Sequence, residues 1–96
     1  MGAVDFYTEA RGKTAQEAFN KAVDQARYDH GHAGYTGSIA EKHGYLMIQV
    51  PAGGDPHEYA GRLIDQADPR IRDKWGPAGC VSLGDGRWLF FGWASS

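Results

Sequence analysis

The sequence predicts a small α+β domain, with two helices on one face of a mainly antiparallel sheet. Three observations predict this class. Residues 3–10 alternate in polarity with the period of a half-buried strand. Residues 14–30 carry apolar side chains at helical spacing. The dipeptide Asp85-Gly86 separates two further strand-like stretches, which is typical of a tight hairpin.

The length of 96 residues fits one domain that spans residues 1–96. Apolar residues make up 42% of the sequence and charged residues 23%, an ordinary globular balance. The formal net charge is −2, so the basic surplus of a typical nucleic-acid-binding domain is missing. We therefore expect no nucleic-acid partner.

Cysteine usage and the N-terminus favour a cytoplasmic protein. Cys80 is the single cysteine, so no disulfide can form within the chain. The first residues lack the basic and apolar regions of a signal peptide. The apolar runs are too short to span a membrane. We expect a cytoplasmic chain with no membrane partner.

The first helix is predicted over residues 14–30. Thr14 and Glu17 have the spacing of a capping box. Gly31 is placed to end the helix in a left-handed conformation. The side chains expected to face the sheet are mostly small: Ala15, Ala18, Phe19, Ala22, Val23 and Ala26.

The second helix is predicted to begin at Asp55-Pro56, with Asp55 as the cap and Pro56 at the first helical position. Its buried stripe is expected to include Leu63 and Ile64. It should end at Asp68, because a residue that precedes proline avoids the α region.

Five strands are expected, over residues 3–10, 35–41, 45–50, 80–83 and 88–93. The resulting order is β-α-β-β-α-β-β, which is the ferredoxin-like plan with an added C-terminal hairpin strand. Right-handed crossovers would place residues 3–10 and 45–50 at the centre of the sheet.

The stretch 88–93 is the most apolar strand, and this plan leaves it at an edge. Exposed apolar edges invite pairing. Two alternatives follow: the strand occupies a central position, or a partner covers it. We therefore expect a protein partner or a homodimer, formed through this edge or through the open face of the sheet.

The open face is expected to present aromatic side chains, which we interpret as an interaction surface. Bases stack on such a face in RNA-binding domains, but Asp5 and Glu9 lie on it here and argue against RNA. The alternatives are that the loop over residues 69–79 or a second subunit packs against this face. The residues assigned to this surface are Tyr7, Tyr45, Trp88, Phe90 and Trp93.

The connection after the first helix is rich in glycine, histidine and hydroxyl groups, more than a helix-to-strand link requires. Its candidate ligand-binding residues are His30, His32, Tyr35 and Thr36. The two histidines, with Asp29, could supply three ligands to zinc, but their spacing matches no zinc motif. We therefore assign no metal and no cofactor.

Two other kinds of site are weaker. Cys80 with a histidine and an acid could form a nucleophilic set, but its neighbours indicate the start of a strand, where a small residue simply packs. The glycine-rich stretch 31–37 follows a helix, whereas phosphate sites favour the start of one. We assign no catalytic residue.

Three stretches carry a resemblance: residues 10–19 (ARGKTAQEAF), 34–42 (GYTGSIAEK) and 68–79 (DPRIRDKWGPAG). They resemble small uncharacterised proteins of actinobacterial phages and their hosts. The resemblance implies a prokaryotic or phage cytoplasmic setting and implies no activity.

These observations favour a small non-enzymatic binding or interaction protein, phage-encoded and acting on a host component. The alternative is a small metal- or ligand-binding enzyme centred on the loop His30–Thr36, assisted by Glu41 or Cys80. That enzyme needs at least three polar side chains to converge in one cleft. Scattered histidines would favour the interaction protein.

Overall fold

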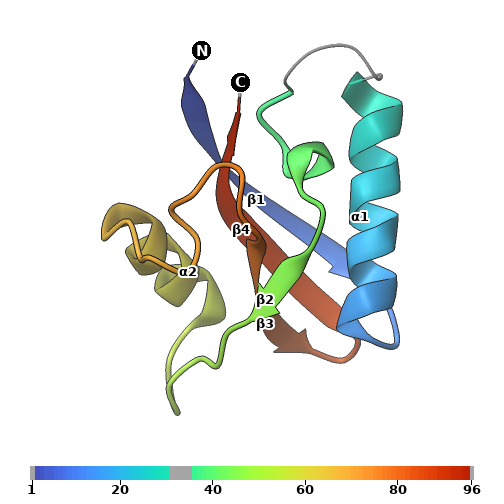
Figure 1. The fold of residues 1–96 in the computed structure, drawn as a ribbon. Coiled ribbons are helices and arrows are strands. Elements are labelled where there is room, and N and C mark those ends of the chain that lie inside the picture. The colour runs from blue at the N-terminus through green and yellow to red at the C-terminus, as the bar shows by residue number, and fades with distance from the viewer. Residues whose placement is uncertain (1, 31–35, 96) are drawn as a thin grey trace.

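The computed structural model describes residues 2–30 and 36–95. Two helices lie on either side of a four-stranded sheet (Figure 1). The elements in chain order are β1 (Ala3–Arg11), α1 (Ala15–His30), the 3-10 helix η1 (Ile39–Glu41), β2 (Tyr45–Met47), α2 (Pro56–Asp65), β3 (Ala78–Gly84) and β4 (Arg87–Ser95).

The α+β class is confirmed, but the order of the strands is different from the expected one. The sheet runs β1-β4-β3-β2, with β1/β4 and β4/β3 antiparallel and β2/β3 parallel. The prediction that residues 3–10 and 45–50 form the centre is wrong, because β1 and β2 are the edges. The apolar β4 takes a central position, which was one of the two alternatives for it.

The two helices cover opposite faces of the sheet, which corrects the expected placement on one face. Phe90 packs with Phe19 of α1, whereas its neighbour Phe91 packs with Leu63 of α2. Consecutive residues of a strand point to opposite faces. Since β4 is apolar at consecutive positions, it can be buried on both sides, and this suits a central strand covered by a helix on each face.

The prediction of α1 is confirmed to within one residue at its start. The Thr14 hydroxyl accepts a hydrogen bond from the Glu17 amide at 3.1 Å. The Glu17 carboxylate accepts from the Lys13 amide at 3.4 Å instead of from Thr14, so the capping box is shifted by one residue.

The start of α2 is also confirmed. The Asp55 carboxylate accepts from the His57 amide at 2.8 Å, and Pro56 occupies the first helical position. The helix ends earlier than predicted, at Asp65. Ala67 adopts a φ of 49°, and the Asp68 amide donates to the Leu63 carbonyl at 3.0 Å, which closes the helix in a Schellman-type turn.

One strand prediction is wrong, and a second is wrong in extent. Within residues 36–41, the expected strand is replaced by η1, and residue 35 lies outside the described residues. The Ser38 hydroxyl caps η1 by accepting from the Ala40 amide at 3.2 Å, which favours a helical turn over a strand. The strand expected over residues 45–50 is shortened to β2, Tyr45–Met47.

The predicted hairpin is confirmed. Asp85 and Gly86 have φ values of 54° and 74°, as a two-residue turn with positive φ at both positions requires. A shift in the β3/β4 register at Ser82 and Gly84 marks a bulge beside the turn.

Within residues 2–30 and 36–95, neither α1 nor α2 is long and apolar enough to cross a bilayer.

Candidate functional site

The histidines do not converge in the part of the chain that the structure describes. His30 lies at the end of α1 and lines a groove beside β1, whereas His43 lines a different hollow on the far side of α1. His57 lies at the start of α2. The candidates His32 and Tyr35 fall outside the described residues. Within residues 2–30 and 36–95, no group of three histidine, cysteine or acidic side chains could hold a metal ion.

Thr36, the remaining loop candidate, makes hydrogen bonds within its own turn. Its amide and its hydroxyl both donate to Glu41 Oε2, at 3.1 and 3.0 Å. The Ser38 hydroxyl lies 2.7 Å from the Thr36 hydroxyl and can donate to it. Thr36 and Glu41 therefore stabilise the entry to η1, and the Thr36 hydroxyl has little capacity left for a ligand.

Cys80 is a core residue of β3. Its side chain is fully buried in the cluster that contains Phe19 and Phe90. Burial raises the pKa of the thiol from 9.0 to about 12. The thiol therefore stays protonated at neutral pH, where a nucleophile would need the thiolate.

The aromatic residues assigned to one surface lie on both faces of the sheet. Phe90 is fully buried and packs against Tyr45, with ring centroids 5.8 Å apart. Trp88 packs on the same cluster and donates from Nε1 to the Gly12 carbonyl at 3.0 Å. Trp93 packs against the opposite cluster, under α2. Of these five aromatics only Tyr7 is well exposed, at 48%, so they do not form one continuous surface.

A buried lysine is the feature that sequence reasoning missed. Lys42 is only 2% exposed. Its Nζ donates to three backbone carbonyls, those of Asp73 at 3.4 Å, Lys74 at 3.3 Å and Gly76 at 2.9 Å. Burial lowers the pKa of Lys42, and the charge of Asp73 opposes this shift. Through these hydrogen bonds, the lysine connects the segment before β2 to the loop between α2 and β3.

Polar side chains around Glu9 connect α2 to the sheet. His57 Nε2 lies 3.0 Å from Glu9 Oε2, and Arg87 approaches the other carboxylate oxygen at 3.9 Å. All three side chains are about half exposed, so each contact contributes little stability. The cluster holds no nucleophile, and its position at the surface is typical of a polar contact between two structural elements.

The longer of the two edge strands in the described sheet is β1, and we call its outer side the β1 edge (Ala3–Arg11). β1 is paired with β4 along its whole length on one side. On its other side, no strand of the described residues pairs with it. The Gly12 amide donates to the Gly86 carbonyl at 3.0 Å, at the end of this ladder. Since antiparallel hydrogen bonding alternates, the even-numbered residues of β1 bond to β4, and Asp5, Tyr7 and Glu9 direct their backbone groups outward.

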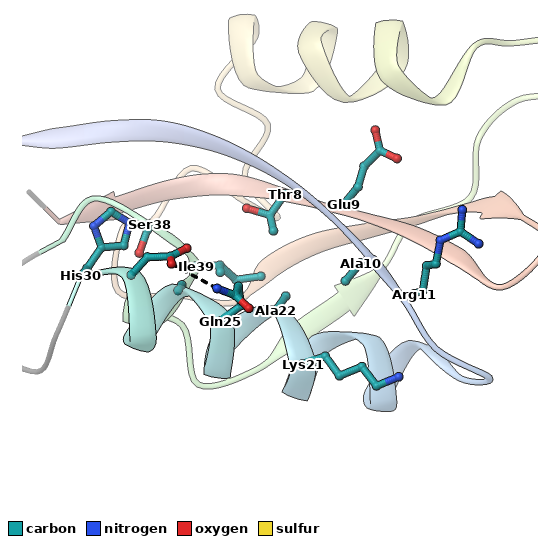
Figure 2. Close-up of a pocket in the computed structure, with 12 residues that line it drawn as sticks. Thr8, Glu9, Ala10, Arg11, Lys21, Ala22, Gln25, His30, Ser38 and Ile39 are labelled. Carbon is teal, nitrogen blue, oxygen red and sulfur yellow. Dashed lines mark hydrogen bonds between the residues drawn. The ribbon is translucent and has the colours of Figure 1, made fainter.

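A groove of about 360 Å³ runs beside this edge, between β1 and α1 (Figure 2). We call it the β1 groove. Its β1 side consists of Thr8–Arg11. Its α1 side carries a row of exposed polar side chains one helical turn apart, namely Lys21, Gln25 and Asp29, and ends at His30. Ala22, Ala26 and Ile39 supply its apolar lining.

The β1 groove contains one of the loop candidates, His30, and most of its other lining residues belong to β1 and α1. No ligand-binding role was predicted for those residues. The alternation over residues 3–10 does predict a strand, yet it cannot tell an edge strand from a central one. The position of β1 becomes clear only from the sheet order.

The site therefore consists of an unpaired backbone edge, a mixed polar and apolar groove, and no converging catalytic set among the described residues. Comparison with protein-family models, curated proteins and solved structures found no match for this chain.

Proposed function

We propose that this protein is a small non-enzymatic interaction module that binds a protein partner through the β1 edge. One observation carries the proposal. A nine-residue strand presents unpaired backbone N–H and C=O groups along its outer side within the described fold. An extended segment of a partner could add to such an edge as a further strand, with side chains entering the β1 groove.

The placement of the candidate chemical groups supports binding over catalysis. His30, His43 and His57 lie in different parts of the molecule. Cys80 is buried as a thiol, and Thr36 is engaged by Glu41. An enzyme would need such groups within reach of one substrate.

The setting forms part of the same proposal. A phage-encoded protein in the bacterial cytoplasm that acts on a host component is consistent with the sequence resemblance and with the single buried cysteine.

The test compares two variants at one position, Tyr7→Pro and Tyr7→Thr. Proline removes the outward N–H of residue 7, and edge strands tolerate proline where that N–H faces solvent. Threonine shortens the same side chain but keeps the N–H. Each protein, checked for native far-UV circular dichroism, is immobilised and exposed to lysate of a candidate bacterial host.

Binding through the edge predicts that partners retained by the wild type are retained by Tyr7→Thr and lost by Tyr7→Pro. If both variants retain the same proteins as the wild type, the partner does not use the β1 edge and the proposal fails.

The alternative, a metal- or ligand-binding enzyme centred on His30–Thr36, retains one favourable observation. His30 lines the β1 groove together with Asp29. Elemental analysis of protein prepared without chelator decides its metal form. A stoichiometric metal that is lost in a His30→Ala/His32→Ala variant would support it, and metal-free wild-type protein would exclude that form.

A further inference from the structure

We infer that the partner of the β1 edge is a second copy of this chain, paired antiparallel about a two-fold axis at Thr8. This inference rests on the proposed use of the β1 edge and adds the identity and register of the partner. It is argued from the order of charges along β1 and along α1.

Among the registers that keep most of β1 paired, the charges favour the one centred on Thr8, because it brings opposite charges together. With Thr8 opposite Thr8 of the second copy, Asp5 lies opposite Arg11 of that copy, and the symmetry gives this pair twice. Tyr7 then lies opposite Glu9 of the second copy. Asp5 and Arg11 are both exposed in the single chain, and both point to the α2 face of the sheet, since Phe6 points to the α1 face. Opposite charges directly across a ladder stabilise it.

The neighbouring registers bring like charges together. Pairing about Tyr7 would place Asp5 opposite Glu9 of the second copy, twice. Pairing about Glu9 would place the two Glu9 side chains opposite each other. Like charges that face each other across strands are destabilising. The charges of β1 thus favour the Thr8 register over these two neighbours.

The exposed row of charges on α1 is compatible with the same two-fold axis. Lys21, Gln25 and Asp29 read basic, neutral and acidic along the helix, so the row is complementary to itself when reversed. An axis that makes the two β1 strands antiparallel makes the two α1 helices antiparallel as well. It directs Lys21, which also forms an exposed contact with Glu17 at 3.4 Å, toward Asp29 of the second copy.

The charges of β1 and those of the α1 row also run in the same direction, with their basic residues at one end of the groove. Arg11 and Lys21 lie toward one end of the β1 groove, and His30 lies at the other (Figure 2). Each copy therefore has a basic end, with Arg11 and Lys21, and an acidic end, with Asp5 and Asp29. The two-fold axis at Thr8 joins the basic end of one copy to the acidic end of the other.

The experiment exchanges the charges of one pair and measures association by sedimentation velocity. The proteins are wild type, Asp5→Arg, Arg11→Asp and the double variant Asp5→Arg/Arg11→Asp. Over about a hundredfold range of concentration, the wild type should move from its monomer mass of 10.5 kDa toward twice that mass. Each single variant should weaken dimerisation by about tenfold, because two attractive pairs become repulsive. The double variant should restore it.

Two further charge reversals serve as matched controls away from β1. Glu58→Arg changes the net charge as Asp5→Arg does, and Arg72→Asp changes it as Arg11→Asp does. Both residues are exposed. The controls should dimerise like the wild type, which separates a pairwise contact from an effect of total charge.

The outcomes separate this inference from the proposed function. A wild type that stays monomeric, or a dimer that the double variant fails to restore, overturns the two-fold pairing. If Tyr7→Pro still abolishes capture of a host protein in that case, the β1 edge keeps its role and only the identity of the partner is wrong.

Discussion

Lys42 carries an ammonium group in a position from which solvent is almost excluded. Three carbonyls, from Asp73, Lys74 and Gly76, surround its Nζ. A lysine ammonium has three N–H donors, so the number of acceptors matches the number of donors. The side chain replaces hydration with fixed backbone dipoles, and it holds a loop that has no regular structure of its own.

Replacing Lys42 with methionine should destabilise the fold by about 2–4 kcal/mol, because three carbonyls lose a charged donor while the apolar stem is kept. Urea unfolding followed by tryptophan fluorescence measures the change. The control Lys13→Met alters an exposed lysine and should cost less than about 0.5 kcal/mol. Equal effects in the two variants would show that the carbonyl cage contributes no stability.

Cys80 gives the fold a pH dependence of known sign. The buried thiol, with a pKa of about 12, keeps a proton that the unfolded thiol, with a pKa of 9.0, releases. The native state thus binds more protons between these values, and its stability falls as pH rises through them.

The measurable prediction is the difference in unfolding free energy between wild type and Cys80→Ala. It should fall by about 2 kcal/mol from about pH 8 to about pH 10.5, at 1.36 kcal/mol for each pH unit above 9. Urea unfolding at the two pH values measures it. A difference that stays constant would mean that the thiol ionises equally in both states. The comparison removes the opposing contribution of Lys42, since its lowered pKa is common to both proteins.

At the scale of elements, the features that depend on local chemistry were predictable. The Thr14 cap, the Asp55 cap and the Asp85-Gly86 turn all formed where the sequence placed them. The segment 36–41 was not predictable in the same way. A network of Thr36, Ser38 and Glu41 side chains competes there with strand pairing, and its strength depends on geometry that spacing alone does not show.

Substitution of two glycines by alanine should change the stability of the protein in opposite directions. At Gly79 in β3, an added Cβ would lie 2.7 Å from Phe91 Cζ and 3.0 Å from Ile48 Cδ1. Gly79→Ala should therefore destabilise the protein by about 1–3 kcal/mol through overpacking. At Gly61 in α2, an added Cβ meets no atom within 4 Å. Gly61→Ala should stabilise the protein by about 0.5–1 kcal/mol through helix propensity.

Thermal unfolding of the two variants measures both changes at once. A neutral Gly79→Ala would mean that the Phe91 and Ile48 side chains lie further from Gly79 than the structure places them. A destabilising Gly61→Ala would mean that this face of α2 is not open.

At the scale of the whole molecule, the sequence indicated the class and missed the arrangement. The strands were mostly recognisable, but their order depends on which strand can be buried on both faces. Alternation in β1 marks a half-buried strand, and the continuous apolar run of β4 suits a central one. A strand that is apolar on both faces needs a cover on each face, and α1 and α2 supply these covers.

The candidate site in the structure differs from the predicted one for the same reason. Of the two loop candidates that the structure describes, His30 lines a groove and Thr36 does not. Those candidates were chosen from local composition, whereas the β1 edge follows from the order of the strands in the sheet. Whether a strand lies at an edge depends on the order of the strands in the assembled sheet. The residues of β1 alone do not predict that position.

The central claim, that the β1 edge is the interaction surface, is tested most directly by amide hydrogen exchange along β1 as the protein is concentrated. The outward amides of Tyr7 and Glu9 should exchange rapidly in dilute protein and become protected as the dimer forms. The amides of Phe6 and Thr8, assigned to the β4 ladder, should be protected at every concentration. Outward amides that exchange at the same rapid rate in dilute and concentrated protein, and in the presence of any captured host protein, would contradict the account.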